Sequence, residues 1–463
     1  MGKEKEGQRE KPVTTNSRVS PGETQLEGTN DPEISFKAKY FTTAAIYFCN
    51  VTFGMSCAYL APLVVDFKTA YQTDVAAISV VFTVSKIVML ICSLAYGFIF
   101  NLVNRHGLII VLLFISGILI ILQPFSPTLI TFGVAWVIIE SALSGYGTAQ
   151  IIWVIEIWKD AAGPYIQGQH FSFALGCIFP SLIFAPFLKQ SYKSSSSNET
   201  IIESNQTLTS MTLDPGSVLS RLYVPCGIIG GMIILGSIFQ LMLFLMVKVP
   251  KGEKPLEDQG VEATNSSLER DDQKGKKILL ITLGSIFLGV IQAMEGIAFQ
   301  FLPTFTHYSE VQMSEVEGAN IMTAFTIAYT LGRLAGIFVS LKIIPQVLIC
   351  VNILFVFASS VVLLIAGNGS DTHSTMLVGS ILLGIGFSTL FPSIFDYLKI
   401  HLEITNVVGA ILMVAGMSIS SISPLIVGVF IEETPAVIVY LNFVCISVGV
   451  ATFVGIMILV RGN

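Results

Sequence analysis

The sequence predicts an all-α membrane protein with 12 transmembrane helices in two six-helix bundles. Of its 463 residues, 53% are hydrophobic and only 12% are charged, and its mean hydropathy is +0.75. A typical soluble domain is about a quarter charged. Apolar segments with roughly the 20 residues that a bilayer requires recur along the chain. One long polar segment, residues 248–277, divides them into two halves of similar length.

The polar segment sets the predicted domain organisation. Of its thirty residues, seven are Lys or Arg and seven are Asp or Glu, and it has too few large apolar side chains to fold by itself. We expect a disordered cytoplasmic N-terminus over 1–38, an N-terminal bundle over 39–247, a cytoplasmic linker over 248–277, a C-terminal bundle over 278–460 and a cytoplasmic C-terminus over 461–463.

Six predicted spans precede the linker and six follow it. The first six are Lys39–Val65, Val75–Phe100, Gly107–Leu122, Thr128–Trp158, Gly163–Leu188 and Leu222–Val247. The second six are Ile278–Phe305, Ala319–Leu341, Pro345–Ala366, Ser374–Leu398, Val407–Phe430 and Ala436–Val460.

Basic residues favour the cytoplasmic side of a membrane. With both termini cytoplasmic, the 25 Lys and Arg residues divide into 19 on that side, 4 on the other and 2 within spans. We therefore expect a multi-pass protein of the plasma membrane, surrounded by the lipid bilayer, with both termini in the cytoplasm. The outer loop 189–221 then carries glycosylation sequons at Asn198 and Asn205, unless these arose by chance.

The composition argues against several function classes. A net charge of -6 offers no basic face for nucleic acid. All seven cysteines lie in apolar segments, which favours buried thiols over disulfides. No short-spaced Cys/His cluster suggests a metal site, and no paired nucleophile and base suggests an enzyme. We expect no cofactor, with sodium or a proton left open as a coupling ion.

An internal repeat places a basic residue inside each half. Phe82-Thr83-Val84-Ser85-Lys86 and Tyr329-Thr330-Leu331-Gly332-Arg333 both have the order aromatic, Thr, aliphatic, small, basic. The two stretches lie in the second span of their halves. Parallel repeated halves with a substrate site between them are a recurring plan of transporters.

Lys86 and Arg333 lie well inside apolar spans, where an unpaired cation is costly. They are either cavity or gate residues, or members of structural ion pairs. Lys86 and Glu140 each lie about a dozen residues into spans of the same direction, so we expect them to pair. Glu295 is the candidate partner of Arg333, which the same helical rise places roughly 10 Å deeper. Glu140 has either a coupling role or a structural one.

Amides and an imidazole provide candidate substrate ligands. Gln167 and His170 share a face at the start of the fifth span, and Gln292 shares a face with Glu295 in the seventh. Such groups both donate and accept hydrogen bonds, which suits a neutral polyhydroxyl ligand. Gln300 is a weaker candidate for binding such a ligand, because it is nearer the outer edge of its span. The alternative is hydrogen bonding between helices.

Several stretches resemble a known family. They are Ala61–Phe67, Ser85-Lys86, the run GPYIQGQHFSFALG from Gly163, Gly332-Arg333 and Phe391-Pro392-Ser393. Together they resemble the major facilitator superfamily. Within it, they are similar to the branch of sodium-dependent glucose transporters and facilitator-domain-containing proteins 4, which is itself similar to fucose permeases.

The chain departs from the family pattern at a few positions. Lys86 stands where the family has Arg, and Asn101 where the superfamily has a gating Asp. Fucose permeases place acids in spans 1 and 4, whereas here Asn50 lies in span 1 and Glu140 could fill the role in span 4. The resemblance implies the transport of a sugar and leaves the coupling ion open.

We therefore expect a transporter of glucose or a related sugar that works by alternating access, with or without coupling to sodium or protons. Gln167, His170 and Gln292 would bind the sugar, and Lys86, Glu140, Glu295 and Arg333 would couple or gate. The alternative is a non-transporting nutrient sensor or scaffold that keeps the fold.

Overall fold

The computed structural model describes residues 36–188, 215–246, 267–367, 369, 373–402 and 406–461. Within these ranges the chain is helical and contains no strand. Eleven of the described helical segments are long and apolar enough to cross a membrane, and one further apolar segment, Val414–Phe430, is shorter. The predicted all-α membrane class is confirmed.

The first half contains the helices that precede the polar segment. They are α1 (Phe36–Ala58), the short 3₁₀ helix η1 (Ala61–Leu63), α2 (Val64–Ala70), α3 (Val75–Leu102), α4 (Arg105–Leu122), η2 (Gln123–Phe125), α5 (Leu129–Trp158), η3 (Lys159–Ala161), α6 (Ala162–Phe184), η4 (Ala185–Phe187), α7 (Pro215–Arg221) and α8 (Tyr223–Met246).

The second half contains the remaining helices. They are α9 (Ser267–Tyr308), α10 (Glu315–Val339), α11 (Pro345–Gly367), α12 (His373–Ser388), α13 (Leu390–His401), α14 (Asn406–Ser421), α15 (Ser423–Phe430) and α16 (Val437–Arg461).

Proline interrupts three of the predicted spans. A proline inside a helix lacks an N–H and its ring clashes with the carbonyl four residues earlier. Pro62 and Pro392 stand four residues after Ala58 and Ser388, which are the last residues of α1 and α12. Pro424 likewise follows the end of α14 by three residues. Each of these spans is therefore two helical pieces, although we predicted continuous segments.

The helix α9 begins earlier than we predicted. We assigned residues 248–277 to an unfolded linker, but the helix starts at Ser267 and continues to Tyr308. Glu, Arg, Gln and Lys are good helix formers in water, so the helix does not need apolar residues to extend beyond the span. The rest of that segment lies outside the described residues, as do residues 1–35 of the predicted disordered N-terminus, whereas residues 36–38, which we also expected to be disordered, belong to α1.

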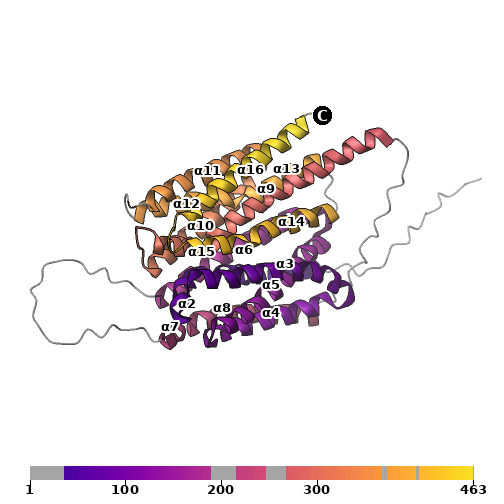
Figure 1. The fold of residues 1–463 in the computed structure, drawn as a ribbon. Helices are drawn as coiled ribbons and strands as arrows, with labels where there is room; N and C mark the ends of the chain where they lie inside the picture. The colour runs from indigo at the N-terminus through magenta and orange to yellow at the C-terminus, as the bar shows by residue number, and fades with distance from the viewer. Residues whose placement is uncertain are drawn as a thin grey trace, which may run out of the picture.

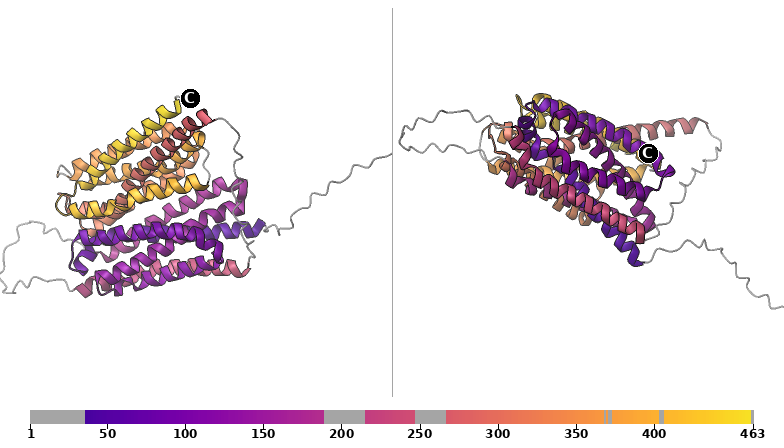
Figure 2. Two further views of the ribbon diagram at one scale, coloured as in Figure 1. Left: turned by 45° about the vertical axis from the view of Figure 1, so that its right-hand side comes forward. Right: turned by 90° about the horizontal axis from the view of Figure 1, so that it is seen from below.

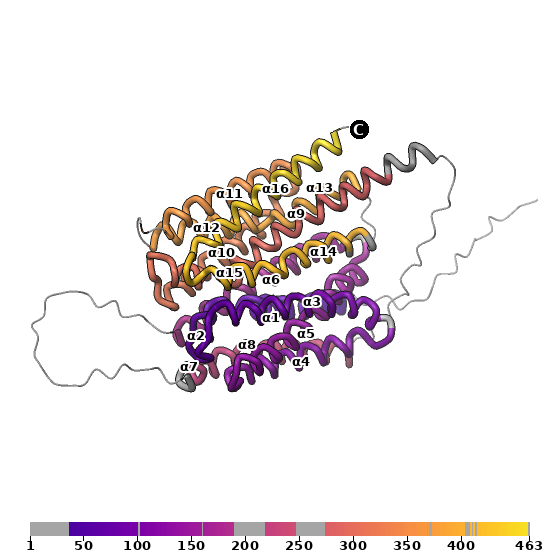
Figure 3. Tube along the Cα trace, in the orientation of Figure 1, coloured from indigo at the N-terminus to yellow at the C-terminus, as the bar shows by residue number. Residues whose placement is uncertain are grey.

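The helices gather into two bundles that follow the order of the chain. In Figure 1, α1 to α8 form the lower bundle, in indigo to magenta, and α9 to α16 form the upper one. Figure 3 traces the same course from α1 to the yellow C-terminus. We call the end where α1 begins and α16 ends the terminal end, and the opposite end, where α2 and α7 lie, the loop end.

The two bundles meet mainly near the loop end. There α15 packs against α3, η1 and α2 pack against α9, and η4 packs against α10, while α6 and α10 pack along a longer contact. Figures 1 and 2 show the bundles diverging toward the terminal end. The surface between the halves is therefore closed at one end of the molecule.

Candidate functional site

A small pocket lies between the two bundles. It is lined from the first half by Cys57, Leu60, Ala61, Phe82, Lys86, Trp136 and Glu140, and from the second by Phe299 and Gln300. Its free volume is about 10 Å³, which is roughly the space of one water molecule. Because both halves supply its walls, a movement of one half against the other would change its size.

An ion pair forms one wall of this pocket. Lys86 Nζ lies 3.2 Å from Glu140 Oε2, so the predicted pair is formed. The Glu140 side chain is 4% exposed and that of Lys86 is 29% exposed. Each residue stands eleven positions after the first residue of its helix, α3 or α5, and the two helices run in the same direction. This shared depth is what the sequence predicted.

Aromatic rings and one amide complete the pocket. Trp136 packs edge to face against Tyr59 at 5.6 Å between ring centres, and the Tyr59 hydroxyl bonds to Gln123. The buried Nε1–H of Trp136 has no acceptor among the described residues. Gln300 adds an amide from the other half.

The second half contains its own charged network. The Tyr329 hydroxyl lies between Glu295 and Arg333 and bonds to both. Arg333 Nη2 lies 3.8 Å from Glu295 Oε1, so the second predicted partner is also close. The guanidinium also reaches into the other half, where Nη1 donates to the His170 carbonyl at 3.3 Å. Arg333 thus connects an acid of its own half to the backbone of α6.

The predicted difference in depth between Arg333 and Glu295 does not keep their side chains apart. A helical side chain points back toward the start of its helix. The Arg333 side chain therefore extends one turn toward Tyr329, which stands four residues earlier on α10. The length of the side chain, which helical rise alone omits, brings the guanidinium to Glu295.

The three predicted substrate ligands do not line the pocket. The side chain of Gln292 lies against α14, with its Nε2 3.3 Å from the place where a Cβ on Gly416 would stand. Gln167 and His170 are half-buried on α6, and the backbone carbonyl of His170 accepts from Arg333. All three lie closer to the terminal end than the pocket does, so in this structure they do not share a site with Lys86 and Glu140.

Some residues that line the pocket were not among our predicted site residues. Gln300 lines the pocket although we placed it near the outer edge, because the closed space lies nearer the loop end than the middle of the spans. Trp136 stands four residues before Glu140 on α5, and this i, i+4 spacing could have identified it. Cys57 and Phe299 carried no comparable signal.

Other predicted positions have no structural description. Asn198 and Asn205 lie outside the described residues, as does the side chain of Asn101. Within the described ranges, no group of three His, Cys, Asp or Glu side chains could hold a metal ion.

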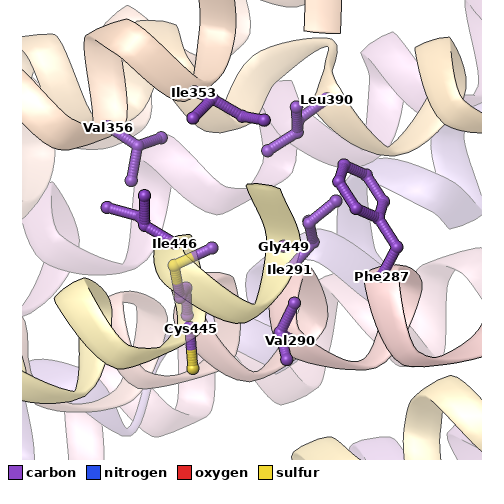
Figure 4. Close-up of a pocket in the computed structure, with 10 residues that line it drawn as sticks. Phe287, Val290, Ile291, Ile353, Val356, Leu390, Cys445, Ile446 and Gly449 are labelled. Carbon is purple, nitrogen blue, oxygen red and sulfur yellow. The ribbon is translucent and has the colours of Figure 1, made fainter. Parts of the chain in front are cut away.

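A second cavity lies wholly within the C-terminal half, as Figure 4 shows. Its walls are almost entirely apolar and come from α9, α11, α13 and α16; they include Phe287, Val290, Ile353, Leu390 and Gly449. Its free volume is also about 10 Å³. Apolar cavities of this size stay dry. It is therefore a packing void and offers no polar group to a sugar.

Comparisons with known proteins identify the family to which the chain is similar. The family model described as "Major Facilitator Superfamily" matches residues 46–424. A protein named "Sodium-dependent glucose transporter 1" from Xenopus laevis is 23% identical over 352 residues, which are 74% of this chain and 67% of that protein. "Major facilitator superfamily domain-containing protein 4A" from Xenopus tropicalis is 21% identical over 417 residues, 78% of this chain and 80% of the relative.

The extent of these alignments varies. Three relatives share the name "Sodium-dependent glucose transporter 1". The alignment covers 67% of the protein from Xenopus laevis, 34% of that from Rattus norvegicus and 62% of that from Danio rerio. Among solved structures, that of a D-xylose-proton symporter superposes with a TM-score of 0.64 at 13% identity, covering 88% of this chain and 96% of the other. At this identity the structural match shows the fold alone.

Proposed function

The chain belongs to the major facilitator superfamily, and on that premise we propose that it moves a sugar, glucose or a close relative, across a membrane by alternating access. The observation that carries the proposal is the pocket between the halves, where an ion pair, an amide and aromatic rings meet. The repeated halves bear on it as well, since they are typical of transporters in which one bundle rocks against the other around a central site.

The chemistry of the pocket suits a neutral polyol. Sugar hydroxyls both donate and accept hydrogen bonds, and the faces of sugar rings are apolar. Gln300 and the Lys86–Glu140 pair offer donors and acceptors, and the rings of Phe82, Trp136 and Phe299 offer apolar surface. The name of the relative from Xenopus laevis, which specifies glucose, supports a sugar as the first candidate.

The pocket must widen to accept a hexose, because its free volume is about 10 Å³. A rocking movement of the halves would do this, since Phe299 and Gln300 stand on the opposite half from the ion pair. Gln167, His170 and Gln292, which lie toward the diverging terminal end, would meet the sugar along its path. We propose that they line the route and that the pocket is the site.

We propose that the coupling ion, sodium or a proton, acts through one of the two buried acids. Glu140 is the first candidate because it lines the pocket and is paired with Lys86. Glu295 is the second, since its network reaches the other half through Arg333. A buried carboxylate in a span is the usual place for such coupling.

We further propose that both termini are cytoplasmic, as the distribution of basic residues favours, and that the protein works in the plasma membrane. The loop end would then face outside, and the structure would be closed on the outer side. Treatment with a glycosidase tests this orientation. A downward shift in apparent mass that disappears in the Asn198→Gln, Asn205→Gln double variant is expected, and a glycan on neither residue would leave the orientation without this support.

The function is tested by uptake of labelled glucose into cells that express the protein, with and without external sodium and at two pH values. Uptake above that of Trp136→Ala cells with equal surface protein is expected. Sodium dependence would identify the coupling ion, and faster uptake at low pH would indicate a proton. Specific binding without uptake, across a panel of sugars, would overturn the proposal in favour of a sensor.

A further inference from the structure

A cluster of polar groups joins the two halves at the loop end. Lys68 on α2 places its Nζ 2.8 Å from Oε2 of Glu432, which lies between α15 and α16, and 3.0 Å from the Tyr308 hydroxyl at the end of α9. The ammonium also lies 5.2 Å from the centre of the Tyr308 ring. The Lys68 and Glu432 side chains are 31% and 27% exposed. A residue of the first half therefore contacts two of the second.

The same carboxylate also caps a helix of the first half. Glu432 Oε1 accepts the backbone N–H of Val75 at 2.7 Å, and Val75 is the first residue of α3. The first N–H groups of a helix have no partner within it and carry the positive end of the helix dipole. Glu432 thus uses one oxygen for Lys68 and the other for α3, and both partners belong to the opposite half.

A layer of aromatic rings lies between this cluster and the pocket. Phe82 on α3 packs edge to face against Phe301 on α9, with 6.1 Å between ring centres. Phe82 is 1% exposed and Phe301 is fully buried. Phe82 also lines the pocket, one turn nearer the loop end than Lys86. Nearby, Gly428 of α15 fits directly against Ser79 of α3, where any Cβ would clash.

We propose that these groups form a two-layer gate that closes the pocket at the loop end. The outer layer is the clasp of Lys68, Glu432, Tyr308 and the N-terminus of α3, and the inner layer is the Phe82–Phe301 pair. The clasp exists only while the halves are together at this end, so breaking it shifts the protein toward states that are open there. The proposal rests on the proposed alternating access but needs no knowledge of the substrate.

The chain contains a natural reporter for the gate. Cys57 lines the pocket and its side chain is partly exposed. A membrane-impermeant cationic thiosulfonate is applied separately to each side of the membrane, and the rate at Cys57 is the difference between each protein and its Cys57→Ser version. In Lys68→Ala and Glu432→Gln, labelling from the loop-end side should rise about fivefold, as expected for the loss of one partly exposed ion pair between the halves.

A matched control breaks an ion pair at the same end within one half. Arg221 Nη2 lies 3.7 Å from Asp66 Oδ1, and both residues belong to the first half. Arg221→Gln should leave the labelling of Cys57 at the wild-type rate from both sides. Unchanged labelling in both clasp variants would overturn the proposal, as would an equal rise in Arg221→Gln.

A second measurement guards against misfolded variants. Lys68→Cys and Glu432→Cys are combined and joined by a short bifunctional thiosulfonate, with each single variant as a control. The joined protein should lose labelling of Cys57 from the loop-end side and keep it from the terminal end. Reduction of the cross-link before labelling should restore labelling from the loop-end side. Labelling from the loop-end side that survives cross-linking would overturn the gate. Because the labelling measurements use no sugar, a negative result would contradict the gate alone, whereas an absence of glucose uptake would contradict the proposed substrate.

Discussion

The two copies of the internal repeat use the same residue types for different contacts. In the first half, Lys86 pairs with Glu140 of its own half and faces the pocket. In the second half, Arg333 lies near Glu295 of its own half but also donates to the His170 carbonyl of the other. Arg has several N–H donors fixed in a planar fork, whereas Lys has a single ammonium. The guanidinium can therefore serve two halves at once.

The threonines of the repeat differ in the same way. Thr330 Oγ1 lies 2.9 Å from the Ala174 carbonyl of the other half, so α10 holds α6 at two carbonyls one turn apart. The hydroxyl of Thr83, its counterpart, is buried and has no partner among the described residues. The second copy therefore ties the halves together, while the first copy forms the wall of the pocket.

At the aromatic position of the repeat, it is the first copy that makes the contact between the halves. Phe82 packs across the halves against Phe301, whereas Tyr329 uses its hydroxyl to bridge Glu295 and Arg333 within its own half. A tyrosine in place of Phe82 would put a hydroxyl into an apolar contact. A phenylalanine in place of Tyr329 would remove the hydroxyl that bridges Glu295 and Arg333. One atom thus distinguishes an element of the gate from an element of a charged network.

The largest effect is expected from Glu140→Gln. It leaves the ammonium of Lys86 without a counter-charge in the pocket, and because that side chain is 29% exposed the cost lies below the about 3–5 kcal/mol of a fully buried pair. Uptake at equal surface level should fall at least about tenfold, since a tenfold change needs only about 1.4 kcal/mol. Glu156→Gln, which breaks the more exposed pair with Arg105, is the control and should retain uptake within about twofold. Unaltered, gradient-driven uptake by Glu140→Gln would contradict a coupling role.

Arg333→Lys tests whether the second copy of the repeat needs a basic residue that contacts both halves. Lysine keeps the charge but cannot bond to Tyr329 and His170 from one planar group. We expect uptake to fall about fivefold and the unfolding temperature in detergent to fall, because a contact between the halves is lost. Arg105→Lys, a pair within one half, should change neither by more than about twofold. Equal behaviour of the two variants would mean that the contact with α6 is incidental.

Tyr329→Phe makes the second copy resemble the first. It removes the hydroxyl between Glu295 and Arg333, at a cost of about 1–3 kcal/mol for polar groups left without that partner. Thermal unfolding should occur at a lower temperature, and the dependence of uptake on pH or sodium should shift if Glu295 couples. A wild-type dependence on both would assign coupling to Glu140 alone.

The smallest expected effect is the difference in stability between Thr330→Val and Thr83→Val. Thr330→Val removes a hydroxyl whose one proton is shared between the Ala174 carbonyl of the other half, at 2.9 Å, and the Thr326 carbonyl of its own helix, at 2.7 Å. The loss should cost about 0.5–1.5 kcal/mol of stability. Thr83→Val removes a buried hydroxyl without a partner and should be neutral or stabilising. Paired unfolding measurements under one set of conditions compare them directly. A loss at Thr83 as large as that at Thr330 would remove the distinction between the copies.

Local features of the sequence determined much of this protein. Apolar runs predicted the spans, because a segment that crosses a bilayer satisfies its backbone hydrogen bonds within a helix and presents apolar side chains to the lipid. The ends of α1 and α12 were encoded by Pro62 and Pro392. The pairing of Lys86 with Glu140 was also predictable, since two helices of equal direction carry residues eleven positions from their starts to the same depth. Each of these inferences uses distances along one helix.

Only the tertiary structure decided how the halves meet. The contacts of Arg333 with His170, of Lys68 with Glu432 and of Phe82 with Phe301 join residues that no local spacing relates. They also fix the position of the pocket, which is why Gln300 lines it and Gln292 does not. Helical rise gives the depth of a residue within its own helix. The tilt and position of one bundle against the other depend on packing over the whole surface between them, and no single segment of the chain encodes that surface.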